Sequence, residues 1–356
     1  MTQPNAALVQ ALEFQAVACD NLGSPFSGGV ARAVAADIAA GGAFAAFTGP
    51  WDGMSVAVLF NEAVPLRFIG GLHHLVLTGA APDLAAQYPA ATDQPDWAKL
   101  VREAGAAVRA HPGAFAEFLK SPPQTNEINR SACLVGGFLA VARETGLPLR
   151  CLEIGASAGL NMNWDRFRYD FGGQGVWGDA ASPVRLATDW SGAAPPFDQA
   201  ATVIERRGCD QKPVDVADPA QALRLQAYVW PDQAARLERL RGAIALALDF
   251  PPVVDAADAG AWAGVHAKPR VGAASVLYHS VVWSYLSPAT RESLLAAIQA
   301  AGESAAADRP FAWLRMEPIP TDMAAPMELR LTLWPGGRES LLAQVHPHGA
   351  RVNWRA

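Results

Sequence analysis

One stretch near the middle of the chain, residues 148–161, constrains the fold more than any other. A mostly apolar run over 149–154 lies between Pro148 and Gly155, so it is too short for a helix and is typical of a buried strand. The loop that follows, from Gly155 to Gly159, holds only Ala and Ser between its two glycines. We therefore expect a ligand to approach this backbone closely and a helix to start beside it.

The segments after this strand alternate between strand-like and helix-like patterns, which predicts a parallel sheet covered on both faces. The expected strands are 149–154, 202–207, 252–255, 275–279 and 311–316, and the expected helices between them include 232–248 and 288–301. The tail alternates at period two over 328–334 and 341–345, around a Pro-Gly-Gly turn, so it predicts an antiparallel hairpin on the sheet. The fold class is therefore α/β.

The first 123 residues show helical, Ala-rich periodicity without intervening strands, which predicts a separate helical cap or bundle. The expected helices there are 6–20, 30–40, 66–77 and 96–120, the last with a break near Pro112. The second predicted domain, 124–356, opens with a helix over 126–145 that Gly146 and Pro148 end.

Composition narrows the class of ligand. The net charge is −6 and the chain has no run of Lys or Arg, which argues against a nucleic-acid partner. It has no stretch of about 18 apolar residues and no signal-peptide pattern, so we expect a cytoplasmic protein without a membrane span. The four cysteines are scattered, which indicates a reducing compartment and neither disulfides nor a zinc site. A small-molecule substrate is the expected partner.

Histidine placement gives no metal site either. His73 and His74 are adjacent, so on a helix they point about 100° apart and cannot bind one metal together. No carboxylate accompanies them, or His346 and His348, at helical spacing. We expect structural histidines.

Four motifs resemble those of class I S-adenosylmethionine-dependent methyltransferases, in the family's order. Leu152-Glu-Ile-Gly-Ala-Ser-Ala-Gly159 resembles the first motif, an acidic residue before a G-x-G-x-G loop, with Ser157 in place of the middle glycine. Gly208-Cys-Asp-Gln-Lys-Pro213 resembles the family's G-x-D-x-x-P. Val253-Val-Asp-Ala-Ala-Asp-Ala259 and the segment from Val276 to Leu286 resemble the third-strand motif and the fourth strand with its exit loop.

Further segments extend the likeness over about residues 140–356. Together with Arg206-Arg-Gly-Cys-Asp210, Tyr228-Val-Trp-Pro-Asp232 and Leu333-Trp-Pro-Gly-Gly337, the first motif looks like a bacterial domain-of-unknown-function family placed among methyltransferase-like folds. The resemblance implies a Rossmann-like, doubly wound sheet, the cofactor S-adenosyl-L-methionine, and methyl transfer to an unidentified small molecule.

The resemblance also implies cofactor-binding roles. Gly155, Ser157 and Gly159, with the following helix N-terminus, would suit the cofactor's carboxylate, and Glu153 would pair with its ammonium. Asp210 would accept both ribose hydroxyls, and Asp258, with Asp255 in reserve, would accept from the adenine amine. The alternative for each acid is a helix cap or a surface charge.

On the acceptor side, His279 ends the fourth strand and is the candidate general base, with Tyr278 beside it and Ser280 and Trp283 flanking it. The polar segment 124–131 is interpreted either as a solvated first turn or as part of the pocket. The expected substrate-binding residues are Asn126, Glu127, Arg130, Asn161, Ser280 and Trp283. The aromatic, Gly-rich insertion at about 169–200 would either shape the substrate pocket or form a structural flap.

Three other functions fit parts of the sequence. The same fold could bind the cofactor or a related nucleoside without catalysis. Gly155-Ala-Ser-Ala-Gly159 also fits the G-x-S-x-G elbow of serine hydrolases, with Ser157, Asp255 and His279 in the matching order, although the chain before it is mainly helical. A nicotinamide-binding domain fits less well, because G-x-x-x-G misses the G-x-G-x-x-G register.

Overall fold

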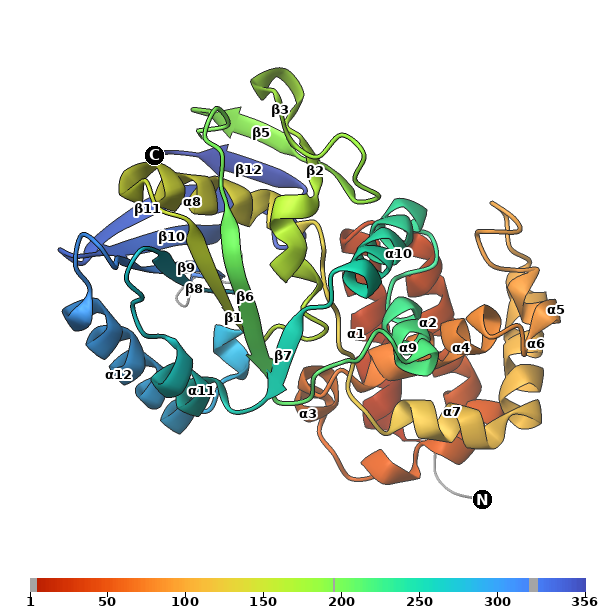
Figure 1. Cartoon of the computed structure of the whole chain (residues 1–356). Coiled ribbons are helices and arrows are strands. Elements are labelled where there is room, and N and C mark those ends of the chain that lie inside the picture. Colours follow the sequence, from red (N-terminus) through yellow and green to blue (C-terminus); the bar gives the residue numbers. More distant parts are fainter. Residues whose placement is uncertain (1–4, 195, 320–325) are drawn as a thin grey trace. The chain divides into compact units, whose positions relative to one another are not determined.

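A computed structural model describes residues 5–194, 196–319 and 326–356 (Figure 1). The chain divides into two compact units. The first comprises Met1–Thr125 and Asp218–Glu238, and the second comprises Asn126–Ala217 and Arg239–Ala356. The first break lies close to the predicted domain boundary at residue 123. Segment 218–238, in contrast, is predicted to lie in the α/β domain but belongs to the helical unit.

The first unit is helical. Its elements are α1 (Ala6–Asn21), α2 (Pro25–Ala39), η1 (Ala43–Phe47), η2 (Gly49–Trp51), α3 (Val56–Asn61), α4 (Val64–Leu77), α5 (Pro82–Ala85), α6 (Trp97–Ala110), α7 (Pro112–Leu119) and α9 (Pro219–Ala227). The break near Pro112 falls where the sequence predicts it, because proline is tolerated in the first turn of a helix but not in its interior.

Aromatic packing explains why segment 218–238 joins this unit. Trp230 belongs to the hydrophobic core that the N-terminal helices build. Tyr228 packs against Phe118 with ring centroids 5.1 Å apart. A Cβ on Gly70 would lie 2.9 Å from the Tyr228 ring, so this close contact requires glycine. The segment packs with the helical unit because it buries two large aromatic side chains there, although its neighbours in the sequence belong to the other unit.

The second unit is built on a nine-stranded sheet in the order β5-β12-β11-β10-β9-β8-β1-β6-β7. Its strands are β1 (Leu149–Ile154), β5 (Asp189–Gly192), β6 (Val203–Asp210), β7 (Val253–Ala256), β8 (Ala274–Ser280), β9 (Phe311–Glu317), β10 (Met327–Trp334), β11 (Arg338–Val345) and β12 (Arg351–Trp354). Every neighbouring pair from β9 to β7 is parallel, the pairs β9–β10, β10–β11 and β11–β12 are antiparallel, and β12 pairs parallel with β5. The predicted α/β class, the parallel strands and the C-terminal hairpin are confirmed.

Helices cover both faces of the sheet (Figure 1). Helix α8 (Arg130–Thr145) packs on one face, and α11 (Ala259–His266) and α12 (Pro288–Ser304) pack on the other, while α10 (Ala234–Asp249) begins in the helical unit and ends in this one. Successive side chains of a strand point to opposite faces. Leu152 and Ile154 accordingly belong to the hydrophobic core with α11 and α12, and Glu153 points the other way.

Two local expectations differ from the structure. Helix α8 begins at Arg130 rather than at residue 126, because Asn126 accepts a hydrogen bond from the Leu160 N–H and does not cap the helix. After the loop, the chain forms a 3₁₀-helix, η3 (Leu160–Arg166), that is kinked at Asn163, where an α-helix is predicted.

The insertion folds largely on its own aromatic side chains. It forms β2 (Arg168–Asp170), η4 (Gly172–Gln174), β3 (Val176–Gly178) and β4 (Arg185–Ala187), with β2, β3 and β4 in a small separate sheet, and β5 at the edge of the large one. Tyr169 and Phe171 are buried and stacked, and Phe171 also stacks on Phe197 at 4.4 Å. These contacts favour the structural-flap interpretation. The end of the insertion lines a cavity of about 240 Å³ through Ala194 and Pro196.

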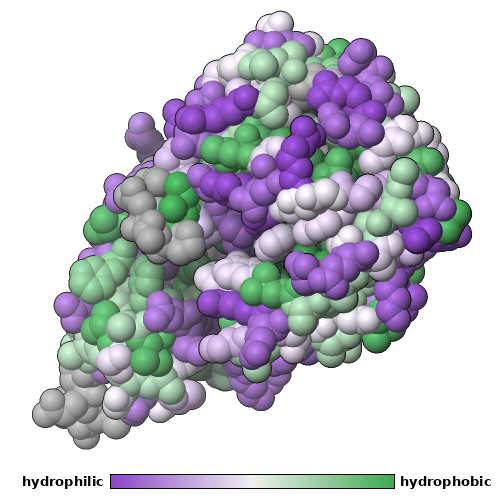
Figure 2. Space-filling model, turned by 90° about the vertical axis from the view of Figure 1, so that its left-hand side faces the viewer, coloured by the Kyte–Doolittle hydropathy of each residue, from purple (hydrophilic) through white to green (hydrophobic). Residues whose placement is uncertain are grey.

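The surface shows no dominant apolar area in the view of Figure 2, where hydrophobic residues form small patches among hydrophilic ones. Within the described ranges, none of the helices combines the length and the apolar character that crossing a bilayer requires.

Candidate functional site

The strand order reverses beside β1. From β1 the chain adds β6 and β7 on one side, and then β8 and β9 on the other. Ligands of open α/β sheets bind outside the carboxyl ends of the strands at such a switch point. We call the carboxyl ends of β1, β6 and β8, with the loop from Gly155 to Gly159, the carboxyl edge. Glu153, Asp210 and Tyr278 are among the predicted site residues that lie there.

Glu153 is the most perturbed carboxyl group of this edge. It is only 3% exposed, and the Tyr278 hydroxyl donates to its Oε2 at 3.2 Å. Burial raises the pKa of Glu153 to about 8, the Tyr278 hydrogen bond opposes the rise, and the charge of Asp210 adds to it. The carboxyl group is therefore mostly protonated at pH 7. Burial, a charged neighbour and a position at the switch point together mark a functional-site candidate.

Asp210 holds the loop in place from the end of β6. Its Oδ2 accepts the Ser157 N–H at 2.9 Å, and its Oδ1 accepts the Lys212 N–H at 2.9 Å. Each carboxylate oxygen has two lone pairs. Asp210 therefore keeps the capacity to accept one further hydrogen bond at each oxygen.

The glycines of the loop serve internal packing. Gly155 and Gly159 have φ of +66° and +70°, which glycine adopts without strain. A Cβ on Gly155 would lie 2.4 Å from Val282, and one on Gly159 would lie 2.7 Å from both Met162 and Val254. The predicted bare backbone is therefore wrong, because the protein's own side chains fill that space.

The loop amides are also engaged within the protein. Ala156 N–H donates to the Cys209 carbonyl at 3.0 Å, and Gly159 N–H donates to the Ala156 carbonyl at 2.7 Å. With the Ser157 amide bound to Asp210 and a kinked 3₁₀-helix following, the loop does not present the helix N-terminus predicted for a ligand's carboxylate. Ser157 itself has φ of +54°, and its buried Oγ has no hydrogen-bond partner among the described atoms.

The segment before α8 contacts η3. Asn161 Oδ1 accepts from the Ser131 hydroxyl at 2.9 Å, and Asn161 Nδ2 donates to the Glu127 carbonyl at 3.2 Å. Asn126 accepts the Leu160 N–H at 3.3 Å. The structure thus brings together Asn126, Glu127 and Asn161, whose contact with a substrate stays a prediction.

Arg130 connects this segment to the carboxyl edge. Its Nη1 donates to the Ser280 carbonyl at 3.3 Å, and its Nε donates to the Pro347 carbonyl at 3.0 Å. The Arg130 charge also lowers the pKa of Glu153, against the effect of burial. The guanidinium thus binds the Ser280 carbonyl and acts electrostatically on the Glu153 carboxyl group.

His279 lies on the opposite face of the sheet and is fully buried. Its Nε2 lies 3.1 Å from the Trp313 indole N–H, which can only donate, so Nε2 must accept and Nδ1 must carry the proton. Nδ1 donates to Glu317 Oε1 at 2.6 Å, and Trp283 stacks on the ring at 6.0 Å. Both nitrogens are engaged, so the geometry contradicts the predicted role of His279 as a general base.

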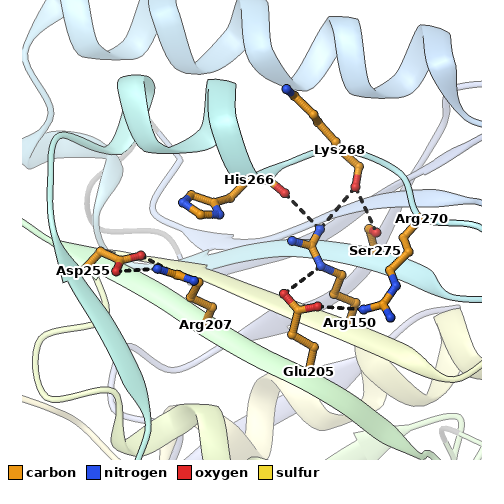
Figure 3. A network of polar contacts seen from close by, with 8 residues as sticks. All are labelled: Arg150, Glu205, Arg207, Asp255, His266, Lys268, Arg270 and Ser275. Atoms are coloured by element: carbon orange, nitrogen blue, oxygen red, sulfur yellow. Dashed lines mark hydrogen bonds and ion pairs between the residues drawn. The ribbon is translucent and has the colours of Figure 1, made fainter.

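Asp255 also faces away from Glu153 and Asp210. It pairs with Cys209 in the β6–β7 register and lies on that residue's face of the sheet. Arg207 binds it through two hydrogen bonds of 2.6 and 2.9 Å (Figure 3). The Trp262 indole N–H also donates to it, at 2.7 Å. These contacts, the Arg207 bond first, lower the pKa of Asp255 to about 2.

Asp258 is the N-cap of α11. Its Oδ1 accepts the Gly260 N–H at 2.9 Å, and its Oδ2 accepts the Thr290 hydroxyl at 2.6 Å. Asp258 is thus a helix cap and Asp255 an ion-paired carboxylate, and the contact of either residue with adenine stays a prediction. In the described part of the chain Ser157, Asp255 and His279 are not hydrogen-bonded to one another, so the geometry gives the hydrolase alternative no support.

Glu317 is a notable residue of this region that the sequence patterns do not single out. Besides His279, its Oε1 accepts the Val282 N–H at 3.0 Å and the Trp283 N–H at 3.3 Å. It thereby holds the turn after β8, where Val281 has φ of +57°, a strained value for a β-branched residue. An acidic residue at the end of a predicted apolar strand, as in Phe311–Glu317, is the signal that could have identified it.

The remaining histidines make structural contacts. His73 is buried, bonds the Ala227 carbonyl at 3.2 Å and stacks on Tyr88. His346 Nδ1 accepts the His348 N–H at 3.1 Å. Within the part of the chain that is described, no group of three or more His, Cys, Asp or Glu side chains is placed to hold a metal.

Comparison with known proteins yields one match. The sequence model of a family described as "Uncharacterized protein conserved in bacteria (DUF2332)" matches residues 9–354. No curated protein sequence and no solved structure is significantly similar to the chain.

Proposed function

The chain belongs to the bacterial family DUF2332, and we propose that it is an S-adenosyl-L-methionine-dependent methyltransferase with a Rossmann-like α/β unit and a small-molecule substrate. The order of its parallel strands along the chain, 3-2-1-4-5 from β7 to β9, supports the Rossmann-like assignment, since doubly wound sheets share it. Glu153 carries the proposal. It is a buried carboxyl group with a raised pKa, and it lies at the strand end next to the switch point.

The amino-acid tail of the cofactor fits the groups around Glu153. That tail carries an ammonium and a carboxylate. Glu153 can bind the ammonium after losing its proton, and the Arg130 guanidinium, near enough to lower the pKa of Glu153, can bind the carboxylate. The tail would thus contact side chains instead of the amides of Ala156, Ser157 and Gly159, which the protein itself engages.

The ribose fits Asp210. A vicinal diol offers two donors, and Asp210 keeps one unused lone pair on each oxygen after binding the Ser157 and Lys212 amides. No comparable group is assigned to the adenine, since Asp255 and Asp258 are engaged elsewhere. The fit therefore rests on the tail and the sugar.

When bound, the cofactor supplies an electrophilic methyl group. The protein's contribution to such an in-line displacement is proximity and orientation. Glu153, Arg130 and Asp210 would fix the cofactor at the carboxyl edge. Because both nitrogens of His279 are engaged, the acceptor should be a group that reacts without an imidazole base.

Binding without transfer is the second candidate function. The same engagement of His279 favours it, because a protein that only senses or stores the nucleoside needs no base. The two functions share one site and differ only in turnover.

Calorimetry with S-adenosylmethionine and S-adenosylhomocysteine tests both. If the ligand ammonium pairs with Glu153, binding at pH 7 should release about one proton, since a group with a pKa of about 8 is mostly protonated there. The binding enthalpy should then depend on the ionisation enthalpy of the buffer. E153Q should lose this dependence and bind at least tenfold more weakly, whereas the matched control E205Q should behave as wild type.

Turnover separates the candidates. Formation of S-adenosylhomocysteine with a panel of amine, hydroxyl and thiol acceptors indicates a methyltransferase, and binding without turnover indicates a sensor. Absence of binding at millimolar ligand contradicts both functions.

A further inference from the structure

Ser157 combines three unfavourable features in one residue. Its φ of +54° lies in the left-handed region, which serine adopts at a cost. It is only 7% exposed, and its Oγ has no hydrogen-bond partner among the described atoms. A buried polar atom without a partner is unfavourable, and such groups in native proteins need an explanation. Strain and an unsatisfied hydroxyl at the same position point to a ligand that satisfies it.

The neighbours of Ser157 indicate which part of a ligand this is. Its own N–H donates to Asp210 Oδ2 at 2.9 Å, so the hydroxyl-bearing residue and the carboxylate are joined by a hydrogen bond. The other residues of the loop are Gly and Ala, so the Ser157 hydroxyl is the only polar side-chain group of this loop. A hydroxyl both donates and accepts, whereas a carboxylate only accepts. The pair can therefore bind a diol at both of its oxygens.

From this geometry we infer that the Ser157 hydroxyl hydrogen-bonds a ribose hydroxyl of the bound nucleoside beside Asp210, and that it makes the site select ribonucleosides over deoxyribonucleosides. This inference rests on the proposed function. It explains why serine occupies a left-handed position in a loop whose other left-handed residues are glycines.

Two substitutions separate binding from strain. S157A removes the hydroxyl and keeps the strained φ, while S157G removes both. We expect each to weaken binding of S-adenosylhomocysteine about tenfold, the usual consequence of losing one well-placed hydrogen bond. S157G should also raise Tm, because glycine relieves the strain. A variant that binds more weakly and melts higher is not explained by damage to the fold.

Deoxy analogues of the ligand identify the hydroxyl. Wild type should bind either the 2′-deoxy or the 3′-deoxy analogue of S-adenosylhomocysteine about tenfold more weakly than the parent compound. S157A should discriminate less between that analogue and the parent, as a double-mutant cycle requires when two groups contact each other, and Asp210 accounts for the discrimination that remains. S27A is the matched control, because Ser27 Oγ is also buried without a partner among the described atoms but lies in α2 of the helical unit. A63G is the strain control, at φ of +51°.

The outcomes are distinct. Wild-type affinity in S157A and S157G, or unchanged discrimination between the parent and the deoxy analogues in S157A, overturns this inference and leaves the proposed function standing. A wild-type protein that does not bind S-adenosylhomocysteine overturns the proposed function and this inference with it.

Discussion

The amino ends and the carboxyl ends of the parallel strands differ in how well their polar groups are paired. Near the amino ends, Arg150 donates to Glu205 at 2.9 Å and to the carbonyls of His266 and Lys268 at 2.9 and 3.2 Å (Figure 3). Arg270 pairs with the second oxygen of Glu205 at 3.0 Å. At the carboxyl edge, by contrast, Glu153 is buried and Ser157 Oγ has no partner among the described atoms. Charges at the amino ends are paired as stability requires, whereas polar groups at the carboxyl edge reduce stability.

The pKa values of two carboxyl groups show a second contrast, between the two faces of the sheet near the carboxyl ends of its strands. Arg207 and the Trp262 indole bind Asp255 and lower its pKa to about 2. Burial raises the pKa of Glu153 to about 8. A shift in opposite directions means that the two groups make stability depend on pH with opposite signs. A carboxyl group whose burial destabilises the fold is expected where a ligand stabilises it.

The largest predicted effect concerns Glu153. Its pKa in the fold is raised above the ordinary value of 4.5, so its contribution to stability is complete below about pH 4.5 and is lost as pH rises through about 8. Over this pH range, ionisation of Glu153 lowers the free energy of unfolding by at most about 5 kcal/mol. Urea unfolding of wild type and E153Q at pH 5 and pH 8 should show that glutamine removes this part of the pH dependence. If the free energy of unfolding changes equally with pH in the two proteins, burial does not disfavour the charged form of Glu153.

The second predicted effect concerns the amino ends. Arg150 is largely buried, and R150A would remove the donor to the carbonyls of His266 and Lys268 and to Glu205 Oε1, leaving Glu205 with Arg270 alone. We expect a loss of about 2–3 kcal/mol in the free energy of unfolding. Ligand affinity should not change, because this network lies away from the carboxyl edge. If R150A lost ligand affinity but kept its stability, the amino ends of the strands and not the carboxyl edge would be the part that binds the ligand.

Local sequence signals located the strands of this sheet well. The run between Pro148 and Gly155 predicted β1 (Leu149–Ile154) with its observed bounds, because both ends carry residues that interrupt regular structure. Strands β5 (Asp189–Gly192) and β12 (Arg351–Trp354) were not predicted. Each is only four residues long, and they pair with each other across a long sequence separation, which no local pattern reveals.

The site was harder to predict, because the pleat decides which face a side chain occupies. Asp210 and Asp255 both lie near strand ends, yet the pairing of Cys209 with Asp255 places the two acids on opposite faces. Register between strands is a tertiary property. The same limit applies to His279, whose neighbours Trp313 and Glu317 come from the adjacent strand β9 (Phe311–Glu317).

The smallest predicted effect concerns Asp255, whose pKa is shifted in the opposite direction to that of Glu153. Because its pKa is lowered, its contribution to stability is present above about pH 3.8 and is lost as pH falls through about 2. The carboxylate is partly exposed to solvent, which screens the Arg207 pair, so we expect D255N to lose only about 1 kcal/mol at pH 7. Relative to wild type, D255N should become less stable as pH rises from 2 to 4, whereas E153Q should become more stable as pH rises from 5 to 8. Stabilities relative to wild type that changed with pH in the same direction for the two variants would mean that the carboxyl groups of Asp255 and Glu153, on opposite faces of the sheet, are not perturbed in opposite ways.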